Sequence, residues 1–345
     1  MTGHTGFKGG WLSLWLQRLG SVVSGYSLEP NTAPNLYASA GVGENMRSIF
    51  ADVRHLECLT NAMAEAEPRI AFHLAAQPIV RESLKDPVGT YETNVMGTVN
   101  FLEAVRRTPS IRVAIIITSD KCYGTDNSST AHTENDSMGG DEPYSSSKGC
   151  AELVTHAYYK SFLSRRSVSV ATARAGNVIG GGDWAKDRLI PDLVRSFSKG
   201  RVLKIRYPEA IRPWQFVLEP LYGYMRLAER LWNFGNIYCG SWNFGPAMDN
   251  EASVKHLVEI AMSRWPNEAN WEKIKTRKKE SSVLKLDSQK AFNNLGWKTR
   301  FDLDDAIDWT LDWYCSYREG NIHMKDYSFN QIGKYEMLID KYESK

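Results

Sequence analysis

The stretch Thr2-Gly3-His4-Thr5-Gly6-Phe7-Lys8-Gly9 opens the sequence and leads directly into a helical pattern. Its glycines follow the spacing G-x-x-G-x-x-G. Glycine lets the backbone turn tightly and approach a diphosphate without interference from a Cβ atom, and the helix that follows supplies amide donors at its N-terminus. The motif therefore predicts a dinucleotide-binding loop, although a glycine-rich loop without a ligand is the alternative for the motif alone. The candidate cofactor-binding residues in it are Gly3, Thr5, Gly6, Phe7 and Gly9.

The first half of the sequence alternates short apolar runs with helical patterns. The runs are rich in Val and Ile and nearly continuous in apolar character, which is typical of strands buried on both faces. They predict strands at residues 21–26, 48–51, 69–74, 112–118 and 168–174. Helical spacing of apolar residues lies between them, at residues 12–19, 88–99 and 144–162. This alternation predicts an α/β fold, a doubly wound, Rossmann-type parallel sheet.

The strand that normally precedes such a glycine loop is missing from this sequence. Met1 stands directly before Thr2, and in a doubly wound sheet the first strand is the central one. We expect the natural protein to carry further residues upstream of Met1 that supply this strand. The alternative is that the chain has lost the strand, in which case its stability and cofactor affinity should both be reduced.

The alternating pattern ends after about residue 175. A run of glycines at residues 180–182, several prolines and many aromatic residues follow. We expect residues 1–175 to form a cofactor-binding Rossmann domain. Residues 176–345 should form mainly a smaller substrate-binding region, with some segments returning to the sheet. Near its end we expect a helix that stops at Gly296 and a second helix that carries Leu303 and Leu311, whereas the polar residues 321–345 should dock loosely.

Composition limits the class of protein. An apolar fraction of 42% and an aromatic fraction of 11% exclude a disordered chain. The net charge of +2 favours neither nucleic acid nor an anionic membrane as a partner, and the longest apolar run, Val113–Ile117, is too short to span a bilayer. Five scattered cysteines, without a CxxC pair or a His/Cys cluster, indicate reduced thiols and no metal site. We therefore expect a cytoplasmic protein.

A candidate catalytic set lies in the middle of the sequence. Tyr144 and Lys148 are four residues apart, on one face of the predicted helix. An adjacent ammonium and an oxidised nicotinamide would both favour the phenolate form of Tyr144, which makes the pair a workable acid–base device for oxidising an alcohol. Taken alone the pair is weak evidence, because a chance surface pair is the commoner explanation. Ser119, however, follows a predicted strand, at the edge where open α/β sheets bind ligands.

The glycine loop, the Leu74-Ala75-Ala76-Gln77 stretch, and the set of Ser119, Tyr144 and Lys148 resemble the extended short-chain dehydrogenase/reductase family. Four strings narrow the resemblance to the branch of that family whose members dehydrate CDP-D-glucose. They are GHTGFKGGWLSLWL (3–16), TSDKCYG (118–124), GNVIGGGDWAKDRLIPD (176–192) and RPWQFVLEPL (212–221). The resemblance implies NAD as cofactor, CDP-D-glucose as substrate, and CDP-4-dehydro-6-deoxy-D-glucose and water as products.

The resemblance also implies roles for single residues. Tyr144 would take the proton of the C4 hydroxyl, Lys148 would hold the nicotinamide ribose, and Ser119 would orient the C4 oxygen. Elimination across C5–C6 would need a protonated Asp120 as acid and a neutral Lys121 as base. Related dTDP-sugar enzymes carry Glu at the position of Lys121, and an exposed ion pair at the loop end is the alternative for these two residues.

Further residues are assigned to ligands on the same basis. Asp52 and Val53 follow the predicted strand at residues 48–51, where the adenine would lie, although Asp52 could equally cap a turn. Ser27 stands where an acidic residue usually marks NAD, so this position alone does not separate NAD from NADP. Leu74, Ala75 and Ala76 join the candidate cofactor residues. The candidate substrate residues are Asn177, Arg188 and Arg212, for which an amide and two guanidinium groups suit sugar hydroxyls and a diphosphate.

Two other functions stay open from the sequence. One is a nucleotide-sugar 4-epimerase of the same family, which needs Ser119, Tyr144 and Lys148 but not the Asp120/Lys121 pair. The other is a dinucleotide-binding protein without catalysis. The helices at residues 88–105 and 153–162 carry more apolar surface than one sheet face can bury, so we also expect a homodimer or homotetramer.

Overall fold

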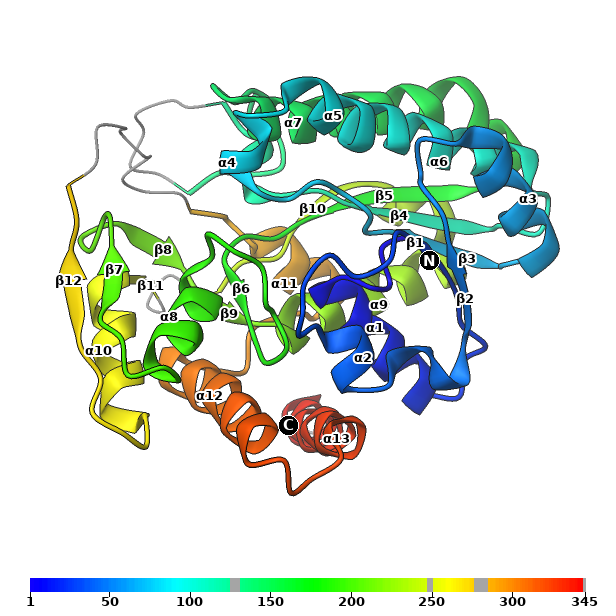
Figure 1. The fold of residues 1–345 in the computed structure, drawn as a ribbon. Helices are drawn as coiled ribbons and strands as arrows, with labels where there is room; N and C mark the ends of the chain where they lie inside the picture. Colours follow the sequence, from blue (N-terminus) through cyan, green and yellow to red (C-terminus); the bar gives the residue numbers. More distant parts are fainter. Residues whose placement is uncertain (125–130, 247–250, 276–284, 344–345) are drawn as a thin grey trace.

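A parallel β-sheet runs through the centre of the molecule (Figure 1). This computed structural model describes all residues except 125–130, 247–250, 276–284 and 344–345. In spatial order the strands are β2 (Arg47–Phe50), β1 (Ser24–Ser27), β3 (Ile70–His73), β4 (Val113–Ile117), β5 (Ser169–Arg174) and β10 (Gly240–Asn243). Every hydrogen-bonded pair among them is parallel. The predicted doubly wound α/β fold is confirmed.

The segment that precedes the glycine loop lies between β1 and β3. Thr2 forms parallel bridges to Tyr26 and to His73. Its amide donates to the Phe72 carbonyl at 2.9 Å, and the Gly3 amide donates to the Tyr26 carbonyl at 2.9 Å. The central position of the sheet, where the sequence shows no full strand, is thus occupied by a short extended segment that joins β1 to β3.

The five predicted strands all exist, and their observed ends lie within three residues of the predicted ones. β4 shows why a continuous apolar run in this sequence predicts a strand. All five of its residues are buried, and successive side chains point to opposite faces of the sheet. Ile115 and Ile117 join one hydrophobic cluster, whereas Ala114 and Ile116 join the other. A strand buried on both faces has no polar positions, so its sequence is continuously apolar.

Helices cover both faces of this sheet (Figure 1). The helices on one face are α1 (Phe7–Arg18) and α9 (Leu218–Phe234). Those on the other are α3 (Leu56–Ala66), α4 (Val80–Ser83), α5 (Pro87–Tyr91), α6 (Gly97–Arg107) and α7 (Pro143–Tyr158). A π-helical turn, Glu92–Met96, joins α5 to α6. This layering brings the glycine loop, at the start of α1, to the same sheet edge as the end of β4.

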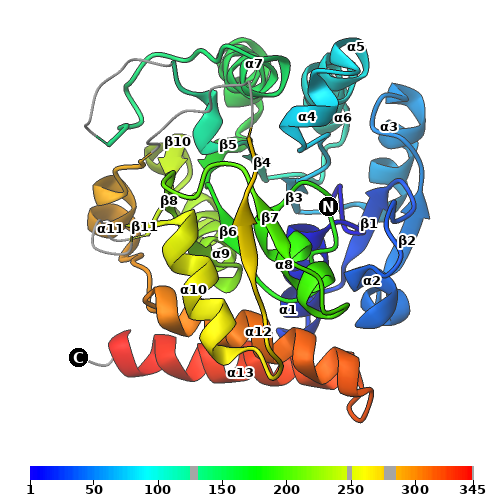
Figure 2. The same ribbon diagram turned by 60° about the vertical axis from the view of Figure 1, so that its left-hand side comes forward.

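Much of the second half forms a smaller lobe beside the sheet, in the foreground of Figure 2. Its strand pairs are β6 (Val178–Ile179) with β9 (Gln215–Phe216), β7 (Leu203–Ile205) with β12 (Trp271–Lys273), and β8 (Ile211–Pro213) with β11 (Glu251–Ser253). Its helices are α8 (Leu189–Phe197) and α10 (Val254–Arg264). The division near residue 175 stays a prediction, and β10 of the second half pairs with β5 of the first.

Three helices end the chain, and α12 and α13 lie along the base of the molecule (Figure 2). They are α11 (Gln289–Leu295), α12 (Leu303–Glu319) and α13 (Met324–Glu343). Gly296 ends α11 in the left-handed conformation (φ 66°), as predicted. The expectation that residues 321–345 dock loosely is wrong. Ile332 and Tyr335, spaced on one face of α13, are completely buried, and the Trp15 indole donates to Glu336 at 2.9 Å.

The remaining general features are simple. All five cysteines are free thiols. Within the described ranges, no helix is both long and apolar enough to cross a membrane. The same ranges contain no group of three or more His, Cys, Asp or Glu side chains that could hold a metal ion.

Packing at Gly181 provides a test of this fold. The Gly181 carbonyl accepts a hydrogen bond from the Trp11 indole at 2.9 Å, and a Cβ atom at Gly181 would overlap the buried ring of Trp313. Gly181→Ala should therefore destabilise the protein by about 1–3 kcal/mol in chemical denaturation, as overpacked cores do. Gly124→Ala is the control, because the nearest atom to its Cβ would be the Ser137 carbonyl oxygen at 3.6 Å. Equal stability of the two variants would contradict the packing described.

Candidate active site

Four side chains predicted as catalytic come together where β4 meets α7. Ser119 and Asp120 follow the carboxyl end of β4, and Tyr144 and Lys148 lie one turn apart near the start of α7. All four are buried. Ser119 is hydrogen-bonded to the Tyr144 side chain, and its Oγ donates to Asp120 Oδ1 at 2.8 Å. Lys148 Nζ donates to the Ile117 carbonyl at 3.4 Å. A hydroxyl, a carboxyl, a phenol and an amine thus share one buried site.

Burial controls the protonation of the two groups on α7. Burial raises the pKa of Tyr144 to about 12, outweighing the hydrogen bond with Ser119 and the charge of Arg188, which both lower it. Burial likewise lowers the pKa of Lys148 to about 8, although the carboxylate of Glu152 raises it. Desolvation disfavours the charged form of each group. Burial therefore favours the neutral phenol of Tyr144 and the neutral amine of Lys148.

Lys121 occupies a different setting from Asp120. Both lie in the 3-10 turn η3 (Asp120–Cys122). Lys121 is partly exposed, and its ammonium makes no hydrogen bond or ion pair with any residue that the structure describes. Only its amide is held, donating to Ser119 Oγ at 3.2 Å. Lys121 can therefore reorient, whereas the backbone at Gly176 packs directly against the Asp120 carboxyl.

The start of α7 is positioned by Glu142, which the sequence analysis did not identify. Its carboxylate caps the helix, accepting from the amides of Tyr144 at 2.8 Å and Ser145 at 3.0 Å. It also accepts from the Ser83 hydroxyl of α4 at 3.1 Å. The available signal was an acidic residue directly before Pro143, since carboxylates and proline favour the first turn of a helix.

A buried ion pair holds the next turns of α7 against the sheet. Arg174 of β5 donates from Nε and Nη2 to the two carboxylate oxygens of Glu152, at 2.9 Å each. The hydroxyls of Thr118 and Thr172 donate to the same carboxylate at 2.5 and 2.6 Å. Thr118 directly precedes Ser119, and Glu152 lies one turn after Lys148. The ion pair therefore fixes the catalytic helix relative to the end of β4.

Asn94 performs a similar task from the π-helical turn. Its amide nitrogen donates to the Ser147 hydroxyl at 2.9 Å and to the Gln77 carbonyl at 3.0 Å, and its oxygen accepts from the Gln77 amide at 2.8 Å. The loop after β3 is thereby joined to α7. Such π-turns are frequent at functional sites, but nothing in the residue pattern around Asn94 predicts one.

The glycine loop fits a dinucleotide diphosphate. Gly3 has a φ of 75°, and a Cβ atom there would lie 2.6 Å from the Ala75 amide nitrogen, so the loop and the Leu74–Ala76 segment are in close contact. Gly6 caps α1 without any side-chain acceptor, and the first turn contains no acidic residue. The amide donors and positive dipole end of α1 are therefore available to an anion.

Other predicted cofactor residues have structural partners. The Thr5 hydroxyl donates to the Leu28 carbonyl at 2.8 Å and bonds to the Ser27 hydroxyl at 2.8 Å. Asp52 pairs with Arg54 at 2.7 Å. Val53 is buried against the backbone of Gly97, the first residue of α6. That these residues contact the adenosine stays a prediction.

The predicted substrate residues occupy three different settings. Asn177 has a strained φ of 45°, and its buried amide nitrogen has no hydrogen-bond partner among the described residues. Arg188 is one-third exposed (33%), pairs with Asp183 at 2.9 Å and acts electrostatically on Tyr144. Arg212 is buried on β8 and donates to the Ile211 carbonyl at 2.8 Å. Of these three residues, Arg188 is the one whose charge acts directly on a catalytic residue, Tyr144.

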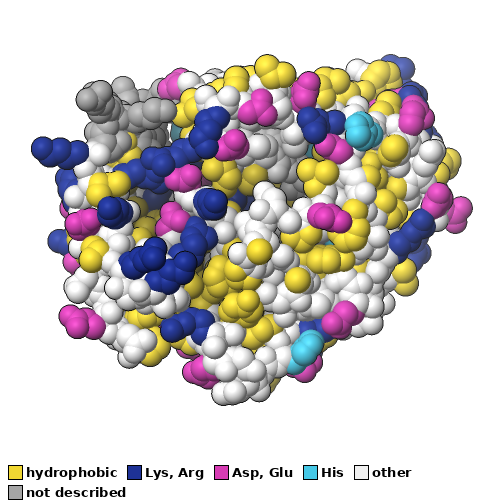
Figure 3. Space-filling view, in the orientation of Figure 1, with side chains coloured by type: hydrophobic (Ala, Val, Ile, Leu, Met, Phe, Trp, Pro, Cys, Tyr) yellow, Lys and Arg dark blue, Asp and Glu magenta, His cyan; other side chains and the backbone are white. Residues whose placement is uncertain are grey.

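Positive charge gathers on the side of the molecule where the smaller lobe meets the sheet domain. Figure 3 shows Lys and Arg side chains on the left of the molecule, where α4, α8 and β7 lie in Figure 1. Arg81 of α4 pairs with Asp187 at 2.9 Å, and Arg206 approaches the same carboxylate at 3.4 Å. Arg81 belongs to the sheet domain, and Asp187 precedes α8 of the smaller lobe, so the ion pair joins these two parts. Two guanidinium groups share the one carboxylate.

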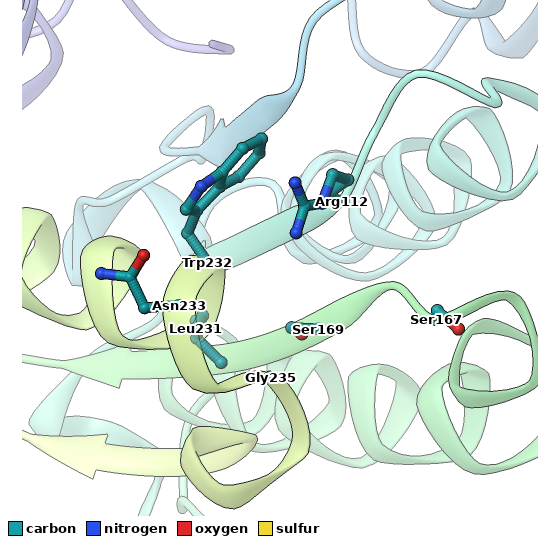
Figure 4. Close-up of a pocket in the computed structure, with 7 residues that line it drawn as sticks. All are labelled: Arg112, Ser167, Ser169, Leu231, Trp232, Asn233 and Gly235. Carbon is teal, nitrogen blue, oxygen red and sulfur yellow. The ribbon is translucent and has the colours of Figure 1, made fainter.

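Two cavities lie at the other end of the sheet. One, of about 410 Å³, is lined by Arg69, Ile70, Glu229 and Trp232. The other, of about 200 Å³, includes Arg112, Ser169 and Trp232 (Figure 4). Ile70 and Ser169 begin β3 and β5, whereas the catalytic set follows the carboxyl end of β4. These cavities are therefore separate from the chemistry described above.

Comparison with known proteins adds independent findings. A sequence model of the family described as GDP-mannose 4,6 dehydratase matches residues 1–310. The CDP-glucose 4,6-dehydratase of Salmonella typhimurium is 46% identical over 326 residues, covering 93% of this chain and 91% of that protein.

Solved structures show the same fold at low sequence identity. UDP-glucose-4-epimerase from Stenotrophomonas maltophila, with bound NAD and formylated UDP-arabinopyranose, has a TM-score of 0.81 at 19% identity, over 92% of this chain and 98% of that one. dTDP-glucose 4,6-dehydratase from Bacillus anthracis in complex with NAD has a TM-score of 0.75 at 21% identity, over 92% and 96%.

The Glu152–Arg174 ion pair yields a stability prediction. Arg174→Met removes one partner and leaves a buried, uncompensated carboxylate, so we expect a loss of about 3–5 kcal/mol in chemical denaturation. The control is Arg226→Met, which breaks the Arg226–Glu229 pair on the surface (23% and 49% exposed) and should cost less than about 1 kcal/mol. A similar small loss for both variants would contradict the structural role of Arg174.

Proposed function

Because this chain belongs to the GDP-mannose 4,6-dehydratase family, we propose that it is a CDP-glucose 4,6-dehydratase. It converts CDP-D-glucose into CDP-4-dehydro-6-deoxy-D-glucose and water, and is thus a hydro-lyase. The observation that carries the proposal is the shared burial of Ser119, Asp120, Tyr144 and Lys148 at one sheet edge. The 46% identity to the Salmonella enzyme supports this choice of substrate.

The cofactor is NAD, and the glycine loop holds its diphosphate. The uncapped amides of α1 and the close contact of Gly3 with Ala75 suit this ligand. Lys148 donates to the nicotinamide ribose from the next turn of the catalytic helix. When bound, NAD accepts a hydride from C4 of the hexose and returns it to C6, so the substrate undergoes no net oxidation.

Tyr144 and Ser119 act at C4. Ser119 donates a hydrogen bond to the C4 oxygen, and Tyr144 accepts the proton of the C4 hydroxyl as the C4–H bond breaks. The phenol must lose its proton to act as this base. The Ser119 hydrogen bond and the charge of Arg188 both lower the pKa of Tyr144 and so oppose the effect of burial.

Asp120 and Lys121 act in the elimination of water. The C4 ketone acidifies the C5–H bond, and Lys121, in its neutral form, removes the C5 proton. Asp120, in its protonated form, gives its proton to the C6 hydroxyl, which leaves as water as the C5=C6 bond forms. Hydride then adds to C6 and the proton returns to C5. Asp120 is held in place by the backbone at Gly176, which suits an acid that protonates the departing C6 hydroxyl. Lys121 is partly exposed and can move, which suits a base that must reach the C5 proton.

Asn177, Arg188 and Arg212 bind the nucleotide sugar. The unpartnered amide nitrogen of Asn177 needs an acceptor, which a phosphate or sugar oxygen supplies. Arg188 reaches the catalytic tyrosine electrostatically and suits the sugar-side phosphate. Arg212 completes this binding surface from β8.

Replacing the phenol tests the acid–base assignment. Tyr144→Phe should lower kcat for CDP-glucose by about 10²–10⁴, the usual contribution of a general acid–base group. CDP binding should be unchanged. Product formation can be followed by NMR of the 4-keto-6-deoxy sugar, with Tyr159→Phe, which removes a surface hydroxyl, as the control. Full activity of the Tyr144→Phe variant would exclude this role, and formation of CDP-galactose by the wild type would identify an epimerase instead.

We further propose that the protein assembles as a homodimer or homotetramer through α5, α6 and α7. This side of the sheet exposes apolar side chains that a monomer would leave in water, including Val88 (67% exposed) and Leu153 (61%). Met96, between α5 and α6, and Phe162, just beyond α7, are also exposed.

Sedimentation tests the assembly. The wild type should sediment as a dimer or larger at micromolar concentration, and the double variant Val88→Glu/Leu153→Glu should sediment as a monomer, because charged residues oppose an apolar interface. Val22→Glu is the control, since Val22 is fully exposed in the turn before β1. A monomeric wild type would rule out the proposed assembly.

A further inference from the structure

His73 is a buried titratable residue that takes no part in the proposed chemistry. It is the last residue of β3 and is 2% exposed. Its Nδ1 atom lies 2.8 Å from the Thr2 hydroxyl oxygen, and its Nε2 atom lies 3.3 Å from the Thr98 hydroxyl oxygen of α6. The ring also stacks on Phe101, with the two ring centroids 4.6 Å apart. Both ring nitrogens therefore have a defined partner.

The hydrogen bonds around the ring determine which nitrogen carries the proton. The Thr2 hydroxyl oxygen accepts from the two amides that follow His73, at 3.2 Å each. A hydroxyl has two acceptor positions and one proton, so Thr2 donates its proton to Nδ1. On the other side, the Thr98 hydroxyl donates to the Asn94 carbonyl at 2.7 Å, so its oxygen accepts from Nε2. Both sides require a neutral ring protonated at Nε2. Burial, which lowers the pKa of His73 to about 3, favours the same neutral form.

Through Thr2, the ring supports the contact between the glycine loop and the chain after β3. Thr2 precedes Gly3, where a Cβ atom would lie 2.6 Å from the Ala75 amide nitrogen, so the two backbones are in close contact. The amides of Leu74 and Ala75 both donate to the Thr2 hydroxyl, and His73 supplies the acceptor that the buried hydroxyl proton needs. Gly3, Leu74 and Ala75 are candidate cofactor residues. His73 therefore holds together two segments that would receive the dinucleotide.

Through Thr98, the same ring is anchored to the network that positions the catalytic helix. The Asn94 carbonyl accepts from Thr98, and the Asn94 amide nitrogen donates to the Ser147 hydroxyl of α7 at 2.9 Å. Ser147 directly precedes Lys148. Every side chain from Thr2 to Ser147 in this series of hydrogen bonds is buried. The ring thus has a fixed orientation, set from the side that carries the catalytic residues.

We propose that His73, neutral and protonated at Nε2, is a positioning residue for the cofactor, which holds the glycine loop against the chain after β3. It acts through Thr2 and not by contact with the hexose. Its loss should therefore weaken NAD binding and leave binding of the nucleotide sugar unchanged. This inference rests on the proposed function, in which NAD is the cofactor.

A matched pair of variants separates the two ring nitrogens. In His73→Asn the side-chain carbonyl oxygen replaces Nδ1 as the acceptor for Thr2. In His73→Gln the amide lies nearer the position of Nε2, and Thr2 loses its acceptor. Both variants lose the stack on Phe101, so their losses of stability in chemical denaturation should be similar. In equilibrium dialysis of the full chain against NAD, His73→Gln should bind NAD about tenfold more weakly than the wild type, and His73→Asn within about threefold.

Thr2 provides a second test that leaves the histidine in place. Thr2→Val keeps the shape of the side chain and removes the hydroxyl, whereas Thr2→Ser keeps the hydroxyl. NAD affinity should fall about tenfold in Thr2→Val and be restored in Thr2→Ser. At saturating NAD, the KM for CDP-glucose should equal the wild-type value in both variants. The ¹⁵N NMR spectrum of the wild-type histidine rings at about pH 7 should contain a neutral ring protonated at Nε2, whose Nδ1 resonance shifts in Thr2→Val.

The outcomes separate the role of His73 from the proposed function. Equal NAD affinity in folded His73→Asn and His73→Gln would overturn the role of His73, and so would unchanged NAD affinity in Thr2→Val or a His73 ring protonated at Nδ1. NAD binding without conversion of CDP-glucose would count against the proposed function alone. If the wild type bound no NAD, the proposed function would fail, and this inference with it.

Discussion

The ion pair between Glu152 and Arg174 is the constraint on which the site depends. It joins α7 to β5, and the Thr118 hydroxyl adds β4 through the same carboxylate. Ser119 follows Thr118 directly, and Lys148 lies one turn before Glu152. Both belong to the catalytic set. A buried ion pair of this kind adds little to the free energy of unfolding. It does fix the position of α7 relative to the sheet. Glu142 and Asn94 hold the same helix at its start and along its side.

The electrostatics of the site depend on what binds there. Burial raises the pKa of Tyr144 and lowers that of Lys148, so each group tends towards its neutral form. A charged ligand that binds in the site then shifts these pKa values and so determines which groups are protonated. A phenol with a high pKa is poorly suited to act as a base by itself, and the charge of Arg188 lowers the pKa of Tyr144.

The sequence predicted those features that depend on local pattern. β4 was recognised because a strand buried on both faces is continuously apolar, and Tyr144 and Lys148 because four residues make one helical turn. The structure added features that depend on contacts distant in the chain. Asn94 acts through a π-turn, and Arg174 meets Glu152 across 22 positions. The docking of α13 was missed because its polar residues outnumber the few, such as Ile332 and Tyr335, that meet the core.

The central claim is that one set of residues oxidises C4 and then delivers hydrogen to C6 of the same hexose. The most direct measurement follows deuterium placed at C4 of CDP-D-glucose through a single incubation with the purified protein. The account predicts a 4-keto-6-deoxy product that carries the label at C6. Label returned to C4 of a hexose that keeps its C6 hydroxyl, or substrate recovered unchanged, would contradict it.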